Sequence, residues 1–112
     1  MEDIRYFMEE SIFTVDSEAT VKIAAELMRT NSISSLLVAK GGAYSGFLTD
    51  TDLTRKLVAK NLDPENTKVS TIASKSVITM EANLSMADAY DCMKEKNIRH
   101  LAITEKGNII GI

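Results

Sequence analysis

Residues 46–53, Gly-Phe-Leu-Thr-Asp-Thr-Asp-Leu, contain the most informative local pattern in the chain. An apolar segment ends at Thr49, a carboxylate follows three residues later at Asp52, and an apolar helical pattern begins at Leu53. A hydroxyl residue followed three positions on by an acidic residue is the spacing of a helix-capping box. The same geometry suits a ligand, because backbone N–H groups at a helix start attract phosphate and a nearby carboxylate can hold ribose hydroxyls. This stretch alone leaves both interpretations open.

Length and charge narrow the class of protein. The 112 residues, 45% hydrophobic and 26% charged, suit one compact domain or two small halves that depend on each other. The net charge of −3 and the lack of a basic block argue against binding to nucleic acid or to an anionic membrane surface. No apolar run approaches the ~20 residues that span a bilayer.

Cysteine and histidine usage argues against disulfides, metal sites and common enzyme chemistry. Cys92 and His100 are the only residues of their types, so we expect no internal disulfide, no typical structural zinc site and a reducing, cytoplasmic setting. The acidic N-terminus, residues 1–5, lacks the long apolar region of a signal peptide. The sequence has no nucleophile–base motif and no Walker-type phosphate loop, so we do not expect an enzyme.

The chain contains two copies of one unit, residues 3–47 and 68–112, in a register of 65 residues without gaps. Thr14 matches Thr79 in this register, and Gly42 matches Gly107. Further identical pairs are Ala24 with Ala89, Met28 with Met93, Ile33 with Ile98, Leu36 with Leu101 and Gly46 with Gly111. Two glycines, a helix face and a strand core in one register indicate a tandem repeat.

Each copy predicts a mixed α/β unit of β-α-β-β-α order. Thr20 or Ser85 caps a helix whose methionine, Met28 or Met93, faces the core. The repeat makes Cys92 a small buried hydrophobic residue, and residues 94–96 a solvated helix end. The expected strands are 12–15, 33–39 and 44–48 in the first copy, and 77–80, 98–104 and one from 109 in the second.

A turn-rich connector separates the copies. A helix over 53–60 should end near Asn61, and Asp63-Pro64-Glu65-Asn66 cannot continue a helix interior. We therefore divide the chain into a first module, 1–62, a connector, 63–67, and a second module, 68–112. The second copy lacks a counterpart of residues 48–62, so we expect the sequence to be an excised, C-terminally truncated fragment.

The doubled register, residues 46–52 and residues 98–103 resemble a tandem pair of CBS domains, often called a Bateman module. The resemblance covers nearly the whole chain. It implies that the modules pack sheet to sheet about a pseudo-twofold axis and that adenosine-containing ligands (AMP, ADP, ATP or S-adenosylmethionine) bind between them. It also implies a regulatory role without a required cofactor, a flat homodimer, and a fused or separate effector domain.

The resemblance also implies which residues bind the nucleotide. Thr49 would contact ribose or phosphate, and Asp52 would hold the ribose hydroxyls. Arg99 and His100, expected on one strand and so on opposite faces, would offer one cation to phosphate. The full set is Leu48, Thr49, Asp52, Val77, Ile78, Thr79, Ile98, Arg99 and His100, with Val77, Ile78 and Thr79 lining the adenine.

A second, weaker cleft is expected from the other half of the repeat. It would use Ile12, Phe13, Thr14, Ile33, Ser34 and Ser35. Ser34 and Ser35 stand where the second copy has Arg99 and His100, so this cleft carries no cation for a phosphate. A structural dimerisation module that binds no ligand is the alternative function.

Overall fold

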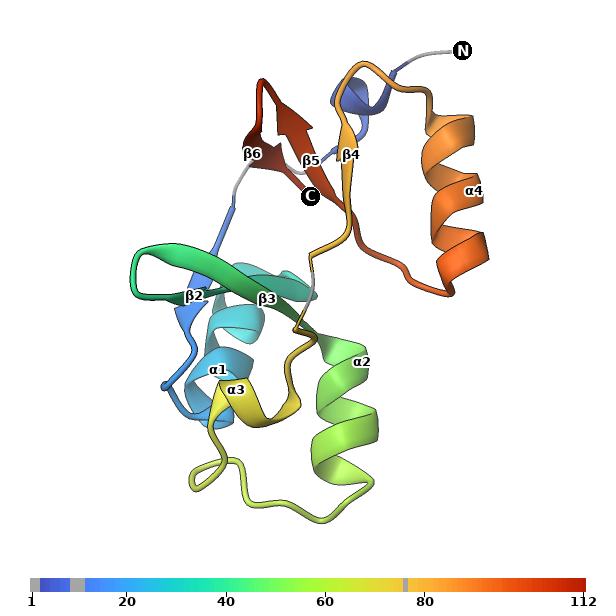
Figure 1. Cartoon of the computed structure of the whole chain (residues 1–112). Helices are drawn as coiled ribbons and strands as arrows, with labels where there is room; N and C mark the ends of the chain where they lie inside the picture. Colours follow the sequence, from blue (N-terminus) through green and yellow to red (C-terminus); the bar gives the residue numbers. More distant parts are fainter. Residues whose placement is uncertain (1–2, 9–11, 76) are drawn as a thin grey trace. The chain divides into compact units, whose positions relative to one another are not determined.

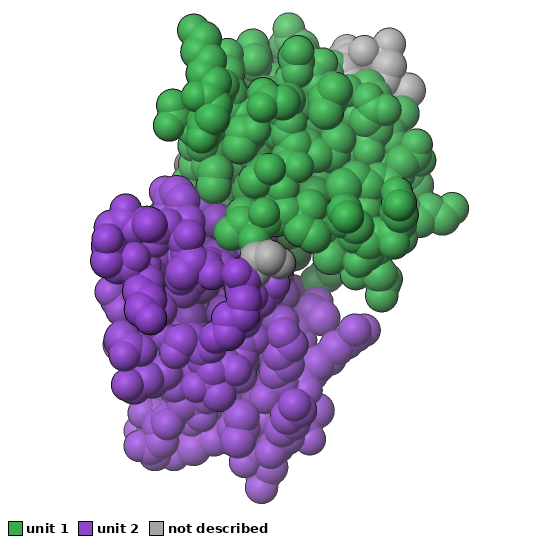
Figure 2. Space-filling view, in the orientation of Figure 1, with its two compact units in different colours: residues 1–12, 77–112 green, residues 13–76 purple. Residues whose placement is uncertain are grey.

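Two three-stranded sheets carry the two copies of the repeat in the computed structural model, which describes residues 3–8, 12–75 and 77–112 (Figure 1). The chain divides into two compact units, shown in Figure 2. Unit 1 comprises residues 1–12 and 77–112, and unit 2 comprises residues 13–76.

Unit 2 contains the first sheet. Strand β1 (Thr14–Asp16) runs parallel to β2 (Ser35–Lys40), which pairs with the antiparallel strand β3 (Ala43–Thr49). Gly41 and Gly42 join β2 to β3 with φ of 58° and 84°. Positive φ at both turn residues is what a two-residue hairpin of type I′ requires, which is why glycine suits this turn.

The helices of unit 2 share one apolar core with one face of its sheet. They are α1 (Val21–Asn31), α2 (Asp50–Asp52), η2 (Leu53–Val58) and α3 (Val69–Ile72). The helix predicted over 53–60 therefore begins earlier, and its η2 part has π-type hydrogen bonding, in which Ala59 N donates to Thr54 O. The buried core residues are Val15, Val21, Ala24, Met28, Leu36, Val38, Leu48, Leu57, Val69, Ile72 and Ala73.

Unit 1 repeats this plan around the second sheet. It contains η1 (Ile4–Tyr6), β4 (Thr79–Glu81), α4 (Met86–Lys96), β5 (Ala102–Glu105) and β6 (Asn108–Gly111). Strand β4 is parallel to β5, and β5 is antiparallel to β6. Ile4, Ala82, Ala89, Leu101 and Ile103 form its buried core.

The predicted register of 65 residues is reproduced in local geometry. Helices α1 and α4 each have 11 residues and begin after the caps Thr20 and Ser85, as predicted. They end alike, because Ser32 and Asn97 adopt left-handed φ values of 52° and 54°. Equivalent elements therefore have equivalent ends as well as similar sequences.

The compact units nevertheless divide the chain differently from the repeat. Ile4 N donates to Leu84 O at 2.8 Å, and Val69 N donates to Ala19 O at 2.8 Å. Ile4 and Val69 are equivalent in the repeat, and so are Leu84 and Ala19. The helical turn that opens each copy thus packs on the sheet and helix of the other copy.

The strands predicted at 33–39 and 98–104 begin too early. Strand β2 begins at Ser35 and β5 begins at Ala102. The cause is the helix end, because Ile33 N bonds Met28 O at 3.0 Å and Ile98 N bonds Met93 O at 2.9 Å. These bonds close the turn after each left-handed residue and delay entry into the sheet.

No helix that the structure describes is long and apolar enough to cross a bilayer.

Candidate functional site

The capping box predicted at residues 49–52 is present at the start of α2. Thr49 Oγ1 accepts a hydrogen bond from Asp52 N at 3.3 Å. Asp52 Oδ2 accepts from Thr49 N at 3.0 Å and from Thr49 Oγ1 at 3.3 Å. The two side chains therefore satisfy backbone donors that would otherwise lack partners at the helix start.

Asp52 has a further partner that sequence reasoning missed. Lys56 Nζ lies 3.0 Å from Asp52 Oδ1, and the side chain of Asp52 is only 13% exposed. The same ammonium donates to the carbonyl of Ile72 at 3.2 Å. A cation four residues after a carboxylate on a helix faces it, so the spacing of Asp52 and Lys56 was a usable signal.

Strand pairing brings together Thr49 with two residues of the second predicted set. Ser35 is the cross-strand partner of Thr49 in the β2–β3 register. Ser34 O accepts from Asp50 N at 3.0 Å, so Ser34 also lies beside the start of α2. Leu48 is fully buried in the core of unit 2, so only its backbone could face a ligand.

The segment after α3 closes the free side of β3. Phe47 N donates to Ser74 O at 3.0 Å, and Ser74 N donates to Phe47 O at 2.9 Å. Gly46 allows this approach, because a β-carbon there would collide with the Ser74 carbonyl. The strand that delivers Thr49 and the helix that carries Lys56 are thus both bound to residues 72–74.

The other predicted nucleotide contacts belong to unit 1. Ile78 O accepts from Ala102 N at 3.0 Å, which sets residues 77–79 beside the start of β5. Arg99 and His100 were predicted on a strand, and this is wrong, because both precede β5 in the turn after α4. Strand alternation therefore does not decide how they face, and Arg99 is exposed while His100 is half-buried.

The rest of the second predicted set lies in unit 2. Phe13 and Ile33 are partly buried and pack against the core, Ile12 is partly buried, and Thr14 is exposed on β1. Phe13 O accepts from Leu37 N at 3.1 Å. This bond is the repeat equivalent of the bond between Ile78 and Ala102.

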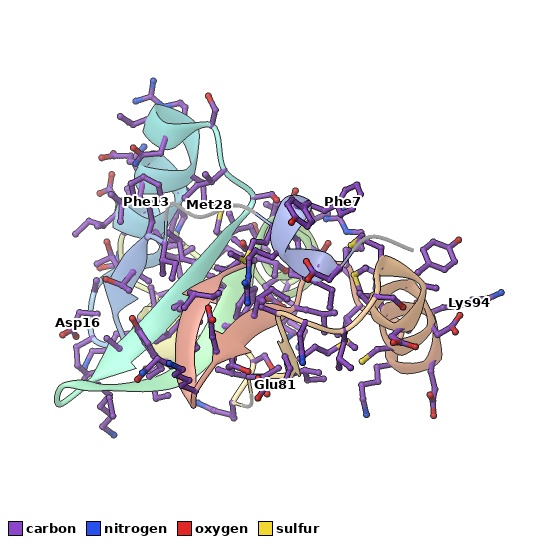
Figure 3. All side chains as sticks on the ribbon, turned by 90° about the horizontal axis from the view of Figure 1, so that it is seen from above. Phe7, Phe13, Asp16, Met28, Glu81 and Lys94 are labelled. Carbon is purple, nitrogen blue, oxygen red and sulfur yellow. The ribbon has the colours of Figure 1, made fainter. Side chains whose placement is uncertain are left out.

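The residues interpreted as structural lie close to their predicted positions, except that Cys92 is partly buried where full burial was predicted. Met28 lies in the core of unit 2, while Met93 and Cys92 pack against the core of unit 1. Lys94 is exposed and extends away from α4 (Figure 3).

Within residues 3–8, 12–75 and 77–112, no group of three or more His, Cys, Asp or Glu residues could hold a metal ion.

A comparison with protein families identifies the repeat. The family model for the CBS domain matches residues 1–59 and 69–112. The chain belongs to the CBS-domain family. Its two matched regions correspond to the two copies of the sequence repeat, so it is a tandem CBS pair.

Individual CBS proteins agree with this assignment. CBS domain-containing protein YhcV of Bacillus subtilis is 30% identical over 112 residues, which is all of this chain and 79% of that protein. A Burkholderia ambifaria protein with CBS domains, for which a signal-transduction role has been suggested, has a TM-score of 0.86 and 31% identity over 91% of this chain and 75% of that one. An uncharacterised Pyrococcus horikoshii protein has a TM-score of 0.90 and 28% identity, and the match covers 98% of this chain and 83% of that one.

Proposed function

We propose that this tandem CBS pair is a regulatory module that senses an adenosine nucleotide (AMP, ADP or ATP). The proposal rests on the carboxylate of Asp52, which is largely buried and stands at a helix start at the end of β3. A carboxylate there can accept hydrogen bonds from ribose hydroxyls, and the helix start favours phosphate. Such a ligand regulates only through its different affinities for two arrangements of the protein.

Unit 1 supplies the proposed phosphate contact. We assign this role to Arg99 ahead of His100, because a guanidinium binds phosphate with two parallel hydrogen bonds. Val77, Ile78, Thr79 and Ile98 remain proposed adenine contacts. Arg99→Ala should then weaken AMP and leave adenosine, which has no phosphate, nearly unchanged.

A calorimetric titration with AMP, ADP, ATP and S-adenosylmethionine tests the proposal. Asp52→Ala should weaken a ribose-containing ligand by about 1–3 kcal/mol, the loss expected for a hydrogen bond to a charged group. Asp88→Ala is the matched control, since Asp88 closes the equivalent capping box of α4 with Ser85. It should lower stability without changing affinity. Lack of heat and of thermal shift with all four ligands would reject the nucleotide proposal.

The alternative is a structural module that associates with a second copy or a partner and binds no ligand. Exposed aromatic side chains of unit 1 favour it, because Tyr6, Phe7 and Tyr90 are 75%, 57% and 65% exposed. Sedimentation with and without AMP separates the two functions. Association that is unchanged by AMP and by Asp52→Ala, in a protein that binds none of the ligands, would support the alternative.

A further inference from the structure

The hydrogen-bond capacity of Asp52 is nearly filled within unit 2. A carboxylate oxygen offers two lone-pair sites. Oδ2 already accepts from the backbone N–H and the hydroxyl of Thr49, at 3.0 Å and 3.3 Å. Oδ1 is paired with Lys56 at 3.0 Å and so retains one site. One ligand hydroxyl can therefore be accepted without rearrangement, whereas a ribose diol needs a second site.

Of these three donors, Lys56 is the one that can most easily give way. The Thr49 N–H belongs to the backbone, and the Thr49 hydroxyl is held because it also accepts from Asp52 N at 3.3 Å. The side chain of Lys56 is 44% exposed and flexible. A diol that binds Asp52 through both hydroxyls should accordingly compete with the Lys56 ammonium.

Lys56 is not needed for the capping box itself. Asp88 closes a capping box of the same type with Ser85 at the start of α4. The residue four positions after Asp88 is Cys92, which carries no cation. The contact between Lys56 and Asp52 is thus an addition to the cap.

The second contact of Lys56 reaches a different segment. Its ammonium donates to the carbonyl of Ile72, the last residue of α3, at 3.2 Å. A cation at this position also stabilises carbonyls that lack partners at a helix end. Two residues later, Ser74 exchanges two hydrogen bonds with Phe47 on β3. Lys56 therefore connects Asp52, whose carboxylate is the proposed ligand contact, to residues 72–74 beside β3.

We propose that Lys56 is a positioning residue that couples Asp52 to residues 72–74. When the carboxylate loses Lys56, the bond to the Ile72 carbonyl and the neighbouring pairing of Ser74 with Phe47 loosen. The coupling itself is a property of unit 2. Its use as a response to ligand rests on the proposed function, in which ribose hydroxyls displace Lys56 from Asp52.

Amide hydrogen exchange without ligand tests the coupling in the whole chain. Lys56→Met and Asp52→Asn should each raise the exchange rates of the Phe47 and Ser74 amides by about 3- to 10-fold, the effect of losing one hydrogen bond of ordinary strength at a partly exposed site. The double variant should exchange no faster than the faster single variant, because both substitutions break one linkage. Lys56→Arg, which keeps the charge, should restore rates to within about twofold.

Lys22→Met is the matched control for this cycle. Lys22 pairs with Glu26 at 3.7 Å with the same spacing of four residues, on the exposed face of α1. Its loss should leave the Ser74 and Phe47 amides unchanged. Equal rates in Lys56→Met and the wild type, or single effects that multiply in the double variant, would overturn the coupling.

Ligand then tests the response. Saturating AMP should raise the Ser74 exchange rate in the wild type, 2′-deoxy-AMP should raise it less, and AMP should add nothing in Lys56→Met. AMP that binds while Ser74 exchange stays constant would overturn the response. If AMP does not bind at all, the proposed function has failed, and the ligand-free cycle still decides whether Lys56 couples Asp52 to residues 72–74.

Discussion

Gly46 is the residue at which the backbone of β3 has no room for a side chain. A β-carbon there would collide with the Ser74 carbonyl, whose oxygen accepts the Phe47 N–H. Gly46→Ala should therefore lower the free energy of unfolding by about 1–3 kcal/mol, the usual cost of overpacking. Urea denaturation measures this difference.

Ser45→Ala provides the control for Gly46→Ala, because Ser45 is exposed on the same strand. It should change stability by less than about 0.5 kcal/mol. If the Gly46→Ala variant were as stable as the wild type, the close contact of Ser74 with β3 would not stabilise the fold.

Among single residues, the capping box was predicted from the sequence, whereas the ion pair of Lys56 with Asp52 and the bonds between distant segments were not. The box of Thr49 and Asp52 was predictable because both partners lie within one turn. The bond from Lys56 to Ile72 joins residues whose spacing carries no local pattern. Periodicity likewise gave no warning that Gly46 serves a close approach to Ser74.

At the scale of elements, the two long helices end with the same backbone conformation and different residues. Ser32 has φ of 52° and Asn97 has φ of 54°, both left-handed. Asparagine tolerates this region through local hydrogen bonding, whereas serine does so less well. The end of α1 is therefore less favourable than the end of α4.

Glycine substitution at these two positions should give unequal results. Ser32→Gly should raise the free energy of unfolding by about 0.5 kcal/mol, the relief of left-handed strain less the added freedom of the unfolded chain. Asn97→Gly should change it by less than that. Thermal unfolding of both variants measures the difference, and a loss of stability in Ser32→Gly would contradict the assignment of strain to α1.

The strand boundaries show where a helix end takes priority over strand propensity. Residues 98–101 are largely apolar or basic and continue into β5, which made a strand from Ile98 plausible. The bond from Ile98 N to Met93 O commits this residue to ending α4 instead. That bond depends on the conformation of Asn97, which a pattern of apolar residues does not encode.

For the whole molecule, the repeat was predictable, but the packing of each opening turn on the other copy was not. The sequence register fixes which residues are equivalent, but equivalent residues could pack within their own copy or on the other. In the structure Ile4 lies in the core with Ala89 and Leu101, while Val69 lies in the core with Val21 and Ala24. Hydrophobic patterns are the same for both arrangements, so tertiary packing decides between them.

Because each opening turn packs on the other copy, a substitution near the N-terminus should act on α4. Ile4 is 3% exposed, so Ile4→Ala should remove about 2–4 kcal/mol of stability, the cost of a cavity in a small core. The loss should fall on unit 1, so the α4 amides should exchange faster while those of α1 keep their protection. Residue-resolved hydrogen exchange measures both helices in one sample.

Val69→Ala is the reciprocal variant, because Val69 is the repeat equivalent of Ile4 and is fully buried in unit 2. It should speed exchange in α1 and spare α4, with a smaller cost of about 2 kcal/mol because fewer atoms are removed. The two variants together distinguish the packing of each turn on the other copy from general destabilisation, since they should have opposite effects on the amides of α1 and α4. If Ile4→Ala instead exposed α1, the opening turn would belong to its own copy, and the division into units 1 and 2 would be wrong.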